Sequence, residues 1–476
     1  MRKLFSIIVM MGLLISVLGF PQIGSYAQAY TTSFTTAITY QNVGTAEATL
    51  LINFYDSPSD TTPISYSPAN LPAGQGASLY IGSVSSIPSS FQGSAVISSD
   101  QPIVATLVQV PQGSSTVFVR PLSNGFSQGA ASALIATVLK NQFGSHSKFS
   151  IQNVDTETNN VNIKFYNLSA SVIYEINQAI EPGASYYVDT NTINELGTSF
   201  NGSVVATAKR VDNSEGKIVG SSMELDIIGT GGKAFESVAS GAKTVYLPSA
   251  LCKFTSAQQN TAYAVQNTSL TTPTNVTVTY KPGGLSESKS IGPGAKATFY
   301  TCDVVAAGFI GSAVVTSDTT DIIAVGKAYG GGLSTAYLGS PTGSTKIALP
   351  YVRWAPDTYY FNGSRQRTYI AVQNVGGSSI PAGSITLTYT DPFGHTGTHT
   401  YGNQLASGEK FNSNATLAGL TWFGMGEPPS SSYGGGVIIN CTAPGCQLIA
   451  IARVQTYVPA TASTAAEDYN GIPINP

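Results

Sequence analysis

The stretch Tyr40-Gln-Asn-Val-Gly-Thr-Ala-Glu-Ala48 decides the fold, because its Gln-Asn pair returns three more times along the chain. The four copies are Gln41-Asn42, Gln152-Asn153, Gln266-Asn267 and Gln373-Asn374, separated by 111, 114 and 107 residues. An interval of this length is that of a whole domain, whereas a single propeller or solenoid repeats every ~20–50 residues. The repeat therefore predicts one small domain copied four times.

Further signals follow each Gln-Asn pair in the same order. The next run ends in an aromatic residue, which we align as Tyr55, Tyr166, Tyr280 and Tyr389. A glycine turn comes next, at Gly74, Gly183, Gly294 and Gly408. The last signal is Phe-x-Gly-Ser at 91–94, 200–203 and 309–312, replaced by Tyr-x-Gly-Gly at 433–436. In the second copy the alternation favours Phe165 as the inward aromatic, so the alignment there is open by one residue.

Strand patterns dominate each copy. Val276, Val278 and Tyr280 alternate with threonines, which is typical of a half-buried strand. Each copy holds about seven such runs between Gly, Pro, Asn and Ser turns, which fits an immunoglobulin-like sandwich of about 100 residues. The Gln-Asn pair then ends a strand, where the Asn side chain bonds to backbone two residues further on. We therefore predict an all-β chain of four tandem immunoglobulin-like β-sandwich domains.

The boundaries that we predict follow from these repeats. They are a cleaved signal peptide at 1–29, domains at 30–125, 126–240, 241–343 and 344–468, and a C-terminal tail at 469–476. Arg2 and Lys3, the apolar run Leu4–Phe20 and the cleavage sequence Ala27-Gln-Ala29 are typical of a secretory signal. The alternative is a retained anchor, but the run is short for a membrane span. We expect an extracellular mature chain without a membrane span.

Charge is sparse in this chain. Without Arg2 and Lys3 it has 20 basic and 25 acidic residues, and only 10% of the sequence is charged. A surface this poor in charge is weakly protected against self-association. No stripe of Lys and Arg is present, which excludes a nucleic-acid partner.

The four cysteines predict disulfides in an exported protein, although four allow three pairings. Cys441 and Cys446 flank a Pro-Gly turn, so a bond between them would clamp a hairpin. Cys252 and Cys302 lie in one repeat and could join its first strand to a later one. Metal binding by these cysteines would need further ligands, and the chain has only three histidines.

The stretches Tyr40-Gln-Asn-Val-Gly-Thr-Ala-Glu-Ala48 and Ala371-Val-Gln-Asn-Val-Gly376 resemble the cell-adhesion-related immunoglobulin-like domains of bacterial surface proteins. The resemblance extends over all four repeats and rests on their turns. It implies an extracellular spacer or adhesive module, and it brings no catalytic residue. The acidic, Asn-rich ending that such domains often carry is missing here.

Motifs of catalysis are absent from the sequence. It contains no Gly-x-Ser-x-Gly, no His-Glu-x-x-His and no phosphate-binding loop ending in Lys-Ser or Lys-Thr. His395 and His399 would lie ~13 Å apart on a strand, too far to share one metal ion. We therefore expect no enzyme, no catalytic residue, no metal and no cofactor.

One loop and seven sequons remain as candidate sites. The fourth repeat carries extra residues that include Trp422, Phe423 and Met425, which form either a contact loop or a cap on the sandwich core. Possible glycosylation sites are Asn167, Asn201, Asn267, Asn275, Asn362, Asn414 and Asn440, about as many as chance would give.

The two ends of the array suggest a hypothesis. The first strand of domain 1 would fall near Pro21, inside the signal peptide, so cleavage would remove it. The tail residues Ile472, Pro473 and Ile474 lie where a fifth opening strand would be expected. Donation of this strand to the next molecule would build a head-to-tail homopolymer. The alternative is a frayed tail and a first domain with fewer strands.

From sequence, we interpret the protein as a non-enzymatic structural protein of the cell surface or of an extracellular filament. Its expected partners are further copies of itself, other surface proteins or glycans. The main alternative is a glycan-binding adhesin with Trp422 as its stacking platform. A secreted hydrolase is a third and weaker alternative.

Overall fold

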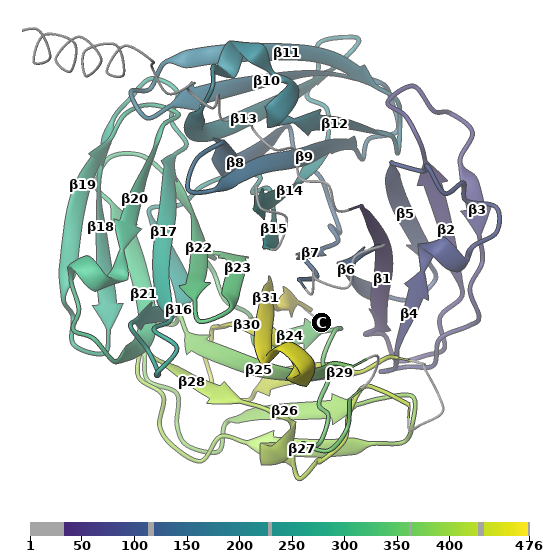
Figure 1. Cartoon of the computed structure of the whole chain (residues 1–476), viewed down its shortest axis with the longest axis vertical. Helices are drawn as coiled ribbons and strands as arrows, with labels where there is room; N and C mark the ends of the chain where they lie inside the picture. The colour runs from purple at the N-terminus through teal and green to yellow at the C-terminus, as the bar shows by residue number, and fades with distance from the viewer. Residues whose placement is uncertain (1–32, 113–118, 227–230, 361–362, 427–432, 475–476) are drawn as a thin grey trace, which may run out of the picture.

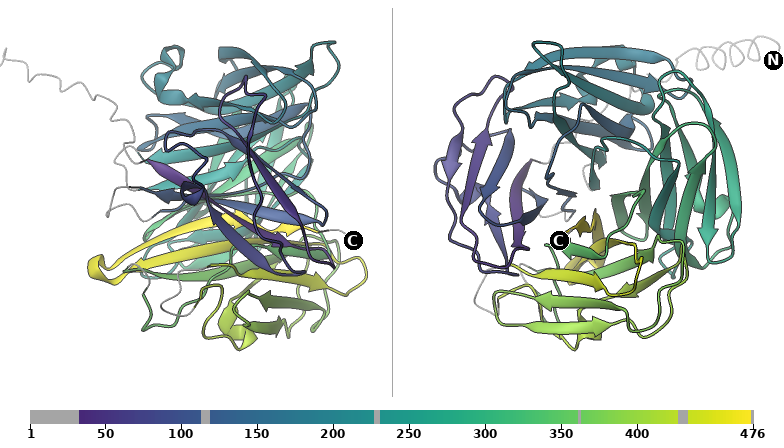
Figure 2. Two further views of the ribbon diagram at one scale, coloured as in Figure 1. Left: turned by 90° about the vertical axis from the view of Figure 1, so that its right-hand side faces the viewer. Right: turned by 180° about the vertical axis from the view of Figure 1, so that it is seen from behind.

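The computed structural model describes residues 33–112, 119–226, 231–360, 363–426 and 433–474, and the predicted signal peptide lies outside them. The described strands form four units arranged around a common centre, so that the molecule is a closed ring (Figure 1). The view from behind shows the same ring (Figure 2). Among the described residues, no helix is long and apolar enough to cross a membrane.

The strands and the short 3₁₀ helices are divided among the units as follows. Unit 1 has β1 (Phe34–Asn42), β2 (Leu50–Tyr55), β3 (Ile64–Tyr66), β4 (Gly76–Tyr80), η1 (Ile81–Ser83), β5 (Ser94–Ser99), β6 (Ile103–Pro111) and β7 (Leu122–Asn124). Unit 2 has β8 (Ser132–Lys140), β9 (Ser145–Asn153), β10 (Asn159–Asn167), β11 (Val172–Ile180), β12 (Ser185–Asp189), η2 (Thr190–Thr192), η3 (Asn194–Leu196), β13 (Phe200–Arg210), β14 (Ile218–Asp226) and β15 (Gly232–Glu236).

Units 3 and 4 continue this division along the chain. Unit 3 has β16 (Thr244–Cys252), β17 (Asn260–Asn267), β18 (Thr274–Lys281), β19 (Ser286–Ile291), β20 (Lys296–Tyr300), η4 (Thr301–Asp303), β21 (Phe309–Ser317), β22 (Ile322–Gly330) and β23 (Leu333–Leu338). Unit 4 has β24 (Lys346–Leu349), β25 (Arg365–Asn374), β26 (Ile385–Thr390), β27 (Thr396–Thr400), β28 (Lys410–Ser413), η5 (Ala415–Ala418), β29 (Gly436–Cys441), β30 (Leu448–Val458), η6 (Pro459–Thr461), β31 (Ser463–Asn470) and β32 (Ile472–Pro473).

Each unit is a sandwich of an outer and an inner sheet (Figure 1). In units 2, 3 and 4 the outer sheet has the order fourth, third, sixth, first strand, as in β11-β10-β13-β8. The inner sheet has the order fifth, second, seventh, eighth, as in β12-β9-β14-β15. The eighth strands β7, β15, β23 and β31 lie nearest the centre of the ring (Figure 1).

This strand order confirms the predicted β-sandwich architecture but differs from that of an immunoglobulin constant domain. There the sheets are A-B-E-D and C-F-G. Here the first strand pairs with the sixth, and the seventh pairs with the second. Residue alternation reports which face of a strand is buried, but it does not report which strands are neighbours, so the sequence could not distinguish the two orders.

Unit 1 departs from the other three in its outer sheet. The described part of that sheet is β3-β2-β5, with three strands, and it contains no counterpart of β8, β16 or β24. Its inner sheet β4-β1-β6-β7 keeps the common order. The sandwich of unit 1 is therefore one strand short within the described residues.

The inward aromatic of the third strand anchors each core. It is Phe54, Phe165, Tyr280 and Tyr389, each at most 2% exposed. Each of them pairs with the residue directly after the Phe-x-Gly-Ser motif or its Tyr-x-Gly-Gly counterpart. These partners are Ala95, Val204, Ala313 and Val437. The sequence alignment on Tyr55 was therefore wrong by one residue, because Phe54 holds the inward position. In unit 2 the expected inward position of Phe165 is confirmed.

Candidate assembly interface

The asparagine of each Gln-Asn pair is fully buried and closes the turn after its strand. Asn42 Nδ2 donates to the carbonyls of Ala46 and Leu71, both at 2.8 Å, and Asn42 Oδ1 accepts from Gly44 N at 2.9 Å. The other three copies form the same three kinds of hydrogen bond. The predicted turn-shaping role of the asparagine is confirmed.

The glutamine has a second role that the sequence reasoning missed. Its Nε2 donates to the carbonyl of the glycine in the same unit's turn, at 3.2, 2.9, 3.1 and 2.9 Å in units 1 to 4. In three places the same carbonyl also accepts from a serine hydroxyl of the preceding unit. These bonds are Ser94 Oγ to Gly183 O (2.8 Å), Ser203 Oγ to Gly294 O (2.6 Å) and Ser312 Oγ to Gly408 O (2.6 Å).

We call this two-donor contact the joint, since it fixes each unit to the next. The glycine is required for two reasons. Gly183 and Gly294 have φ of 82° and 68°, a left-handed conformation that favours glycine. A Cβ would also lie 2.4 Å from the Tyr55 ring at the first position and 2.6 Å from the Tyr166 ring at the second. Tyr55 and Tyr166 thus both contact the next unit.

A fourth contact, between units 4 and 1, closes the ring, and it lacks the serine donor of the joint. Gly436 stands where the other units have the joint serine, and a Cβ on it would lie 2.4 Å from Gln41 Nε2. A residue with a Cβ at this position would therefore require the end of the Gln41 side chain to shift. Val108 and Leu122 of unit 1 also belong to the apolar cluster that contains the core of unit 4, including Leu349.

Buried charges add to the interface between units 2 and 3. Lys327 Nζ of unit 3 lies 2.5 Å from Glu224 Oε1 of unit 2, and Lys233 lies 3.4 Å from the other carboxylate oxygen. Burial alone would raise the pKa of Glu224, but the two lysines outweigh it and hold the pKa at about 2. Lys296 Nζ donates to Thr137 Oγ1 across the same interface at 2.7 Å, and burial holds its pKa well below the usual range.

The interface between units 3 and 4 has further polar contacts beside its joint. Arg453 holds Asp468 through two hydrogen bonds of 2.8 and 2.7 Å within unit 4. Thr335 of unit 3 donates to the same carboxylate at 2.7 Å. Asn470 bonds to both the amide and the carbonyl of Leu338, each at 2.8 Å.

Two buried carboxyl groups hold the end of unit 1 at the ring centre. Glu467 of β31 accepts a hydrogen bond from the backbone amide of Arg120, and Glu236 of β15 accepts one from the backbone amide of Asn124. Burial raises the pKa of Glu236 to about 7 and that of Glu467 to about 8. Asn124 Nδ2 also donates to the carbonyl of Asn470 at 2.8 Å. Residues of β7 are thus clamped between units 2 and 4.

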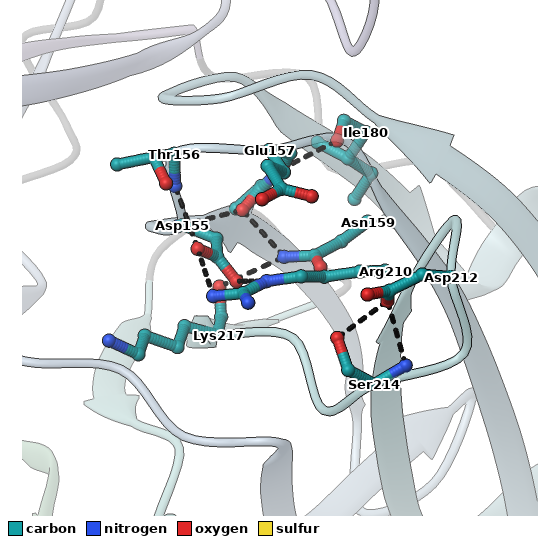
Figure 3. A network of polar contacts seen from close by, with 10 residues as sticks. Asp155, Thr156, Glu157, Asn159, Ile180, Arg210, Asp212, Ser214 and Lys217 are labelled. Atoms are coloured by element: carbon teal, nitrogen blue, oxygen red, sulfur yellow. Dashed lines mark hydrogen bonds and ion pairs between the residues drawn. The ribbon is translucent and has the colours of Figure 1, made fainter.

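An ion pair also supports the turn after the Gln-Asn pair of unit 2 (Figure 3). Arg210 Nε and Nη2 each donate to the Asp155 carboxylate at 2.8 Å, and this hydrogen bonding holds the pKa of Asp155 below its usual range. Asn159 Nδ2 donates to Asn153 Oδ1 at 2.7 Å. The network stiffens the turn that positions Gln152 for its joint.

The cysteines form the two disulfides Cys252–Cys302 and Cys441–Cys446, as predicted. The first ties β16 to η4, and the second spans the turn between β29 and β30. In the described parts of the chain, no three His, Cys, Asp or Glu side chains gather as a metal site would require. His395 bonds to Asp391 and His399 to Ser413, so the two histidines have separate partners.

The candidate contact loop folds back onto its own unit. Phe423 is 0% exposed and packs edge-on against Tyr389, while Met425 is 4% exposed. Trp422 Nε1 donates to the Met425 carbonyl at 2.6 Å, and its ring lies 4.3 Å from that of Tyr359. This placement matches the alternative that these residues cap the core.

The sequons differ in exposure. Asn275 is exposed, whereas Asn267 is fully buried as the joint asparagine of unit 3, so glycosylation there would disrupt the turn. Asn362 lies outside the described residues. The half-buried sequons are Asn167, Asn201, Asn414 and Asn440.

The tail belongs to its own unit. Ile472 and Pro473 pair with Ala348 and Ile347 of β24, and Ile474 N donates to the Lys346 carbonyl at 3.0 Å. Val238 and Ser340 make the corresponding bridges to β8 and β16 in units 2 and 3. Ile472, Pro473 and Ile474 therefore occupy a regular position of every complete unit, which differs from the predicted role as a strand donor to a second molecule.

A hollow of about 380 Å³ lies on the outer sheet of unit 2. Its polar lining includes Asn160, Asn162, Asn177, Gln178, Thr207 and Lys209. Asn162 Nδ2 donates to Asn177 Oδ1 at 2.8 Å. The hollow therefore offers neutral amide donors and acceptors to solvent.

No family model matches this chain, and no curated protein matches it. Among solved structures, it is similar to one described as "Crystal structure of tetra-tandem repeat in extending region of large adhesion protein". The identity is 11% over 94% of this chain and 96% of that chain, with a TM-score of 0.12. A likeness with this TM-score carries no argument about function.

Proposed function

We propose that the protein is an extracellular structural protein whose four units form a rigid ring at the cell surface. The observation that carries the proposal is the joint, in which one glycine carbonyl accepts from the glutamine of its own unit and from the serine of the preceding unit. Because the joint recurs and the last unit meets the first, the side chains that recur along this chain serve assembly. Side chains that hold units together fit a structural role.

Other features support an extracellular, non-enzymatic role. Two disulfides suit an oxidising compartment. Three carboxyl groups with perturbed pKa values, Glu224, Glu236 and Glu467, are buried and bonded at contacts between units rather than exposed in a cleft. Perturbed pKa values also arise in structural networks, and these three fit that use.

The ring also changes how further assembly would occur. Head-to-tail contacts between units are satisfied inside one chain, because unit 4 already occupies the face of unit 1 that a second molecule would use. Polymerisation through the joint would require the ring to open. We therefore place contacts with further copies or other surface proteins on the remaining surface.

Imaging together with one matched pair of variants tests this proposal. Immunogold labelling should locate the protein outside the cell, and negative-stain images of the purified chain should show closed rings. Gly434→Ala should open a share of the rings, because its Cβ would lie 2.6 Å from the backbone oxygen of Gly76 in unit 1, whereas Gly377→Ala places its Cβ in open space. Protein found inside the cell would refute the location, and extended chains for wild type would refute the ring.

A second candidate function is glycan binding, favoured by the amide-lined hollow of unit 2. Amide groups can hydrogen-bond to neutral sugar hydroxyls without the cost of burying a charge. Screening against polysaccharides should reveal binding that Asn162→Ala weakens. Thr277→Ala is the matched control, since Thr277 pairs with Ser288 in unit 3 as Asn162 pairs with Asn177 in unit 2. Equal loss in both variants would contradict a site in the hollow.

A further inference from the structure

The first strand has the same two neighbours in every complete unit. On one side it pairs with the sixth strand, as β8, β16 and β24 pair with β13, β21 and β29. On the other side its third residue pairs with the chain just after the eighth strand. Those bridges are Leu134 to Val238, Tyr246 to Ser340 and Ala348 to Ile472.

Within the described residues, unit 1 has both neighbours without a strand between them. The residue after its eighth strand is fixed by a backbone hydrogen bond from Gly125 N to Ala105 O, at 2.9 Å. Equivalent bonds in the other units are Ser237 to Gly220, Gly339 to Ala324 and Gly471 to Ala450, at 2.7, 2.8 and 2.8 Å. Phe126, the next residue, therefore holds the place of Val238, Ser340 and Ile472. We call the space between β5 and Phe126 the slot.

The exposure of the slot agrees with a missing strand. Phe126 is 40% exposed. Ala95 and Ile97 of β5 are only partly buried, while their counterparts Val437 and Ile439 in unit 4 are both 0% exposed. Among the described residues β5 pairs with β2 alone. From unit 2, the Gln152 side chain lies 3.5 Å from the Ala95 carbonyl oxygen, which is one side-chain contact in place of a strand.

The three strands that fill this position elsewhere indicate the chemistry of an occupant. Residues Ala133–Leu139 of β8 are uncharged and each at most 5% exposed, because the strand is covered on both faces. β16 and β24 contribute the buried residues Val245, Leu247, Ile347 and Leu349. A charged side chain in the slot would have to lose its water without a partner. The slot therefore accepts an extended, apolar, uncharged segment.

We infer that a strand from another polypeptide chain completes unit 1 by pairing with β5. The inference rests on the proposed extracellular assembly, in which residues 1–29 are removed as the signal peptide. An added strand gains main-chain hydrogen bonds along the open edge and covers apolar side chains that would otherwise promote aggregation. The chain's own tail is excluded as donor because Ile472 and Pro473 pair with β24.

A peptide with the sequence of β8, Ser132–Lys140, is the probe for the slot. Labelled with a fluorophore, it should bind the purified secreted chain with a 1:1 stoichiometry, measured by anisotropy. The same peptide with Ile135→Asp should bind at least about tenfold more weakly, because its aspartate would enter an apolar site. Hydrogen exchange should show protection of β5 amides on binding, with β13 amides unchanged.

A self-filled variant is the matched control. Residues 132–144 are grafted directly ahead of Phe34, the counterpart of Ser145, so that the chain carries its own first strand, and this variant should no longer bind the peptide. Absence of peptide binding by the secreted chain would overturn the inference. Terminal sequencing that finds residues before 30 retained, together with β5 amides already protected, would assign the slot to the chain itself and overturn it too. Images of the same sample report ring closure separately, so a failed slot and a failed ring are distinguishable.

Discussion

Units 1 and 4 share their strand order but use different chemistry where they meet the ring centre. In unit 4, Arg453 of β30 pairs with Asp468 of β31, and both are hydrogen-bonded to each other. At the same positions of unit 1, Val108 pairs with Leu122, and these side chains join the apolar cluster of unit 4. The same fold therefore places a side-chain pair at the same position in both units, but one pair is charged and the other is apolar.

The largest expected effect comes from breaking the ion pair of unit 4. Asp468→Ala leaves Arg453 buried without its partner and should lower the free energy of unfolding by about 3–5 kcal/mol. The double variant Arg453→Val with Asp468→Leu copies unit 1 and should recover most of that loss, because an apolar pair needs no desolvation of charge. Urea unfolding followed by tryptophan fluorescence measures both. A double variant as unstable as Asp468→Ala would show that the two positions are not interchangeable.

The disulfides should have the next largest effect, and they are found only in units 3 and 4. Cys252 and Cys302 are 50 residues apart, so removing their bond should cost about 4 kcal/mol by loop entropy. Cys441 and Cys446 are 5 residues apart, for which the same relation gives about 2 kcal/mol. Thermal unfolding of Cys302→Ser and Cys446→Ser compares them. A larger loss for Cys446→Ser would contradict the loop-length argument.

The carboxyl groups that hold unit 1 should make the free energy of unfolding depend on pH in the opposite sense to Glu224 at the interface of units 2 and 3. The pKa values of Glu236 and Glu467 are raised from 4.5 to about 7 and 8, so their contribution is full below pH ~4.5 and lost as pH rises through the folded values. The pKa of Glu224 is lowered to about 2, so its contribution is lost only as pH falls toward that value.

Each raised carboxyl should lower stability by about 1.4 kcal/mol per pH unit between its unfolded and folded pKa. Denaturant midpoints measured from pH 4 to pH 9 should therefore fall with rising pH. The variant Glu236→Gln with Glu467→Gln should flatten the fall, whereas Glu224→Gln should leave it in place. A profile that rises over this range in wild type would contradict the assignment.

The smallest effect concerns the joint serines. Ser203→Ala removes a buried hydrogen bond to Gly294 O, whose carbonyl keeps its bond from Gln266, so the loss should be about 1 kcal/mol. Ser94→Ala should cost less, because Ser94 is only partly buried beside the slot. Chemical denaturation compares the two. If binding of the β8 peptide raises the cost of Ser94→Ala, the slot and the joint are coupled.

Much of the fold could be predicted from the sequence because local signals determine it. Alternation at Val276, Val278 and Tyr280 predicted a strand, and glycine turns marked where the chain reverses. The aligned aromatic of unit 1 was placed one residue late, because Phe54 and Tyr55 are adjacent aromatics and composition does not tell which one faces inward. In unit 2 the alternation of Val161, Ile163 and Phe165 indicated the inward residue correctly. The Asx turns of Asn42 and its equivalents were predictable because their partners lie close in sequence.

The joint could not be predicted, since its three members are far apart in the chain. Gln152 and Gly183 are separated by one hairpin, and Ser94 comes from the preceding unit. The fixed order of Gln, Gly and Ser in the repeats was the only signal, and spacing alone does not show that they meet. The tail was misplaced for a similar reason, because Pro473 resembled an opening strand while the bond of Gly471 to Ala450 sets its true register.

Ring closure also gives the protein a fixed count. The fourth unit brings Gly436 against Gln41 of the first, so the faces of all four units are used within one chain. Deleting unit 2, residues 126–240, would leave two complementary faces pointing past each other and exposed. Such faces would find partners on other molecules, in an open series rather than a closed one. The contact of Gly436 with Gln41 thus decides whether the chain forms a discrete particle or a fibre.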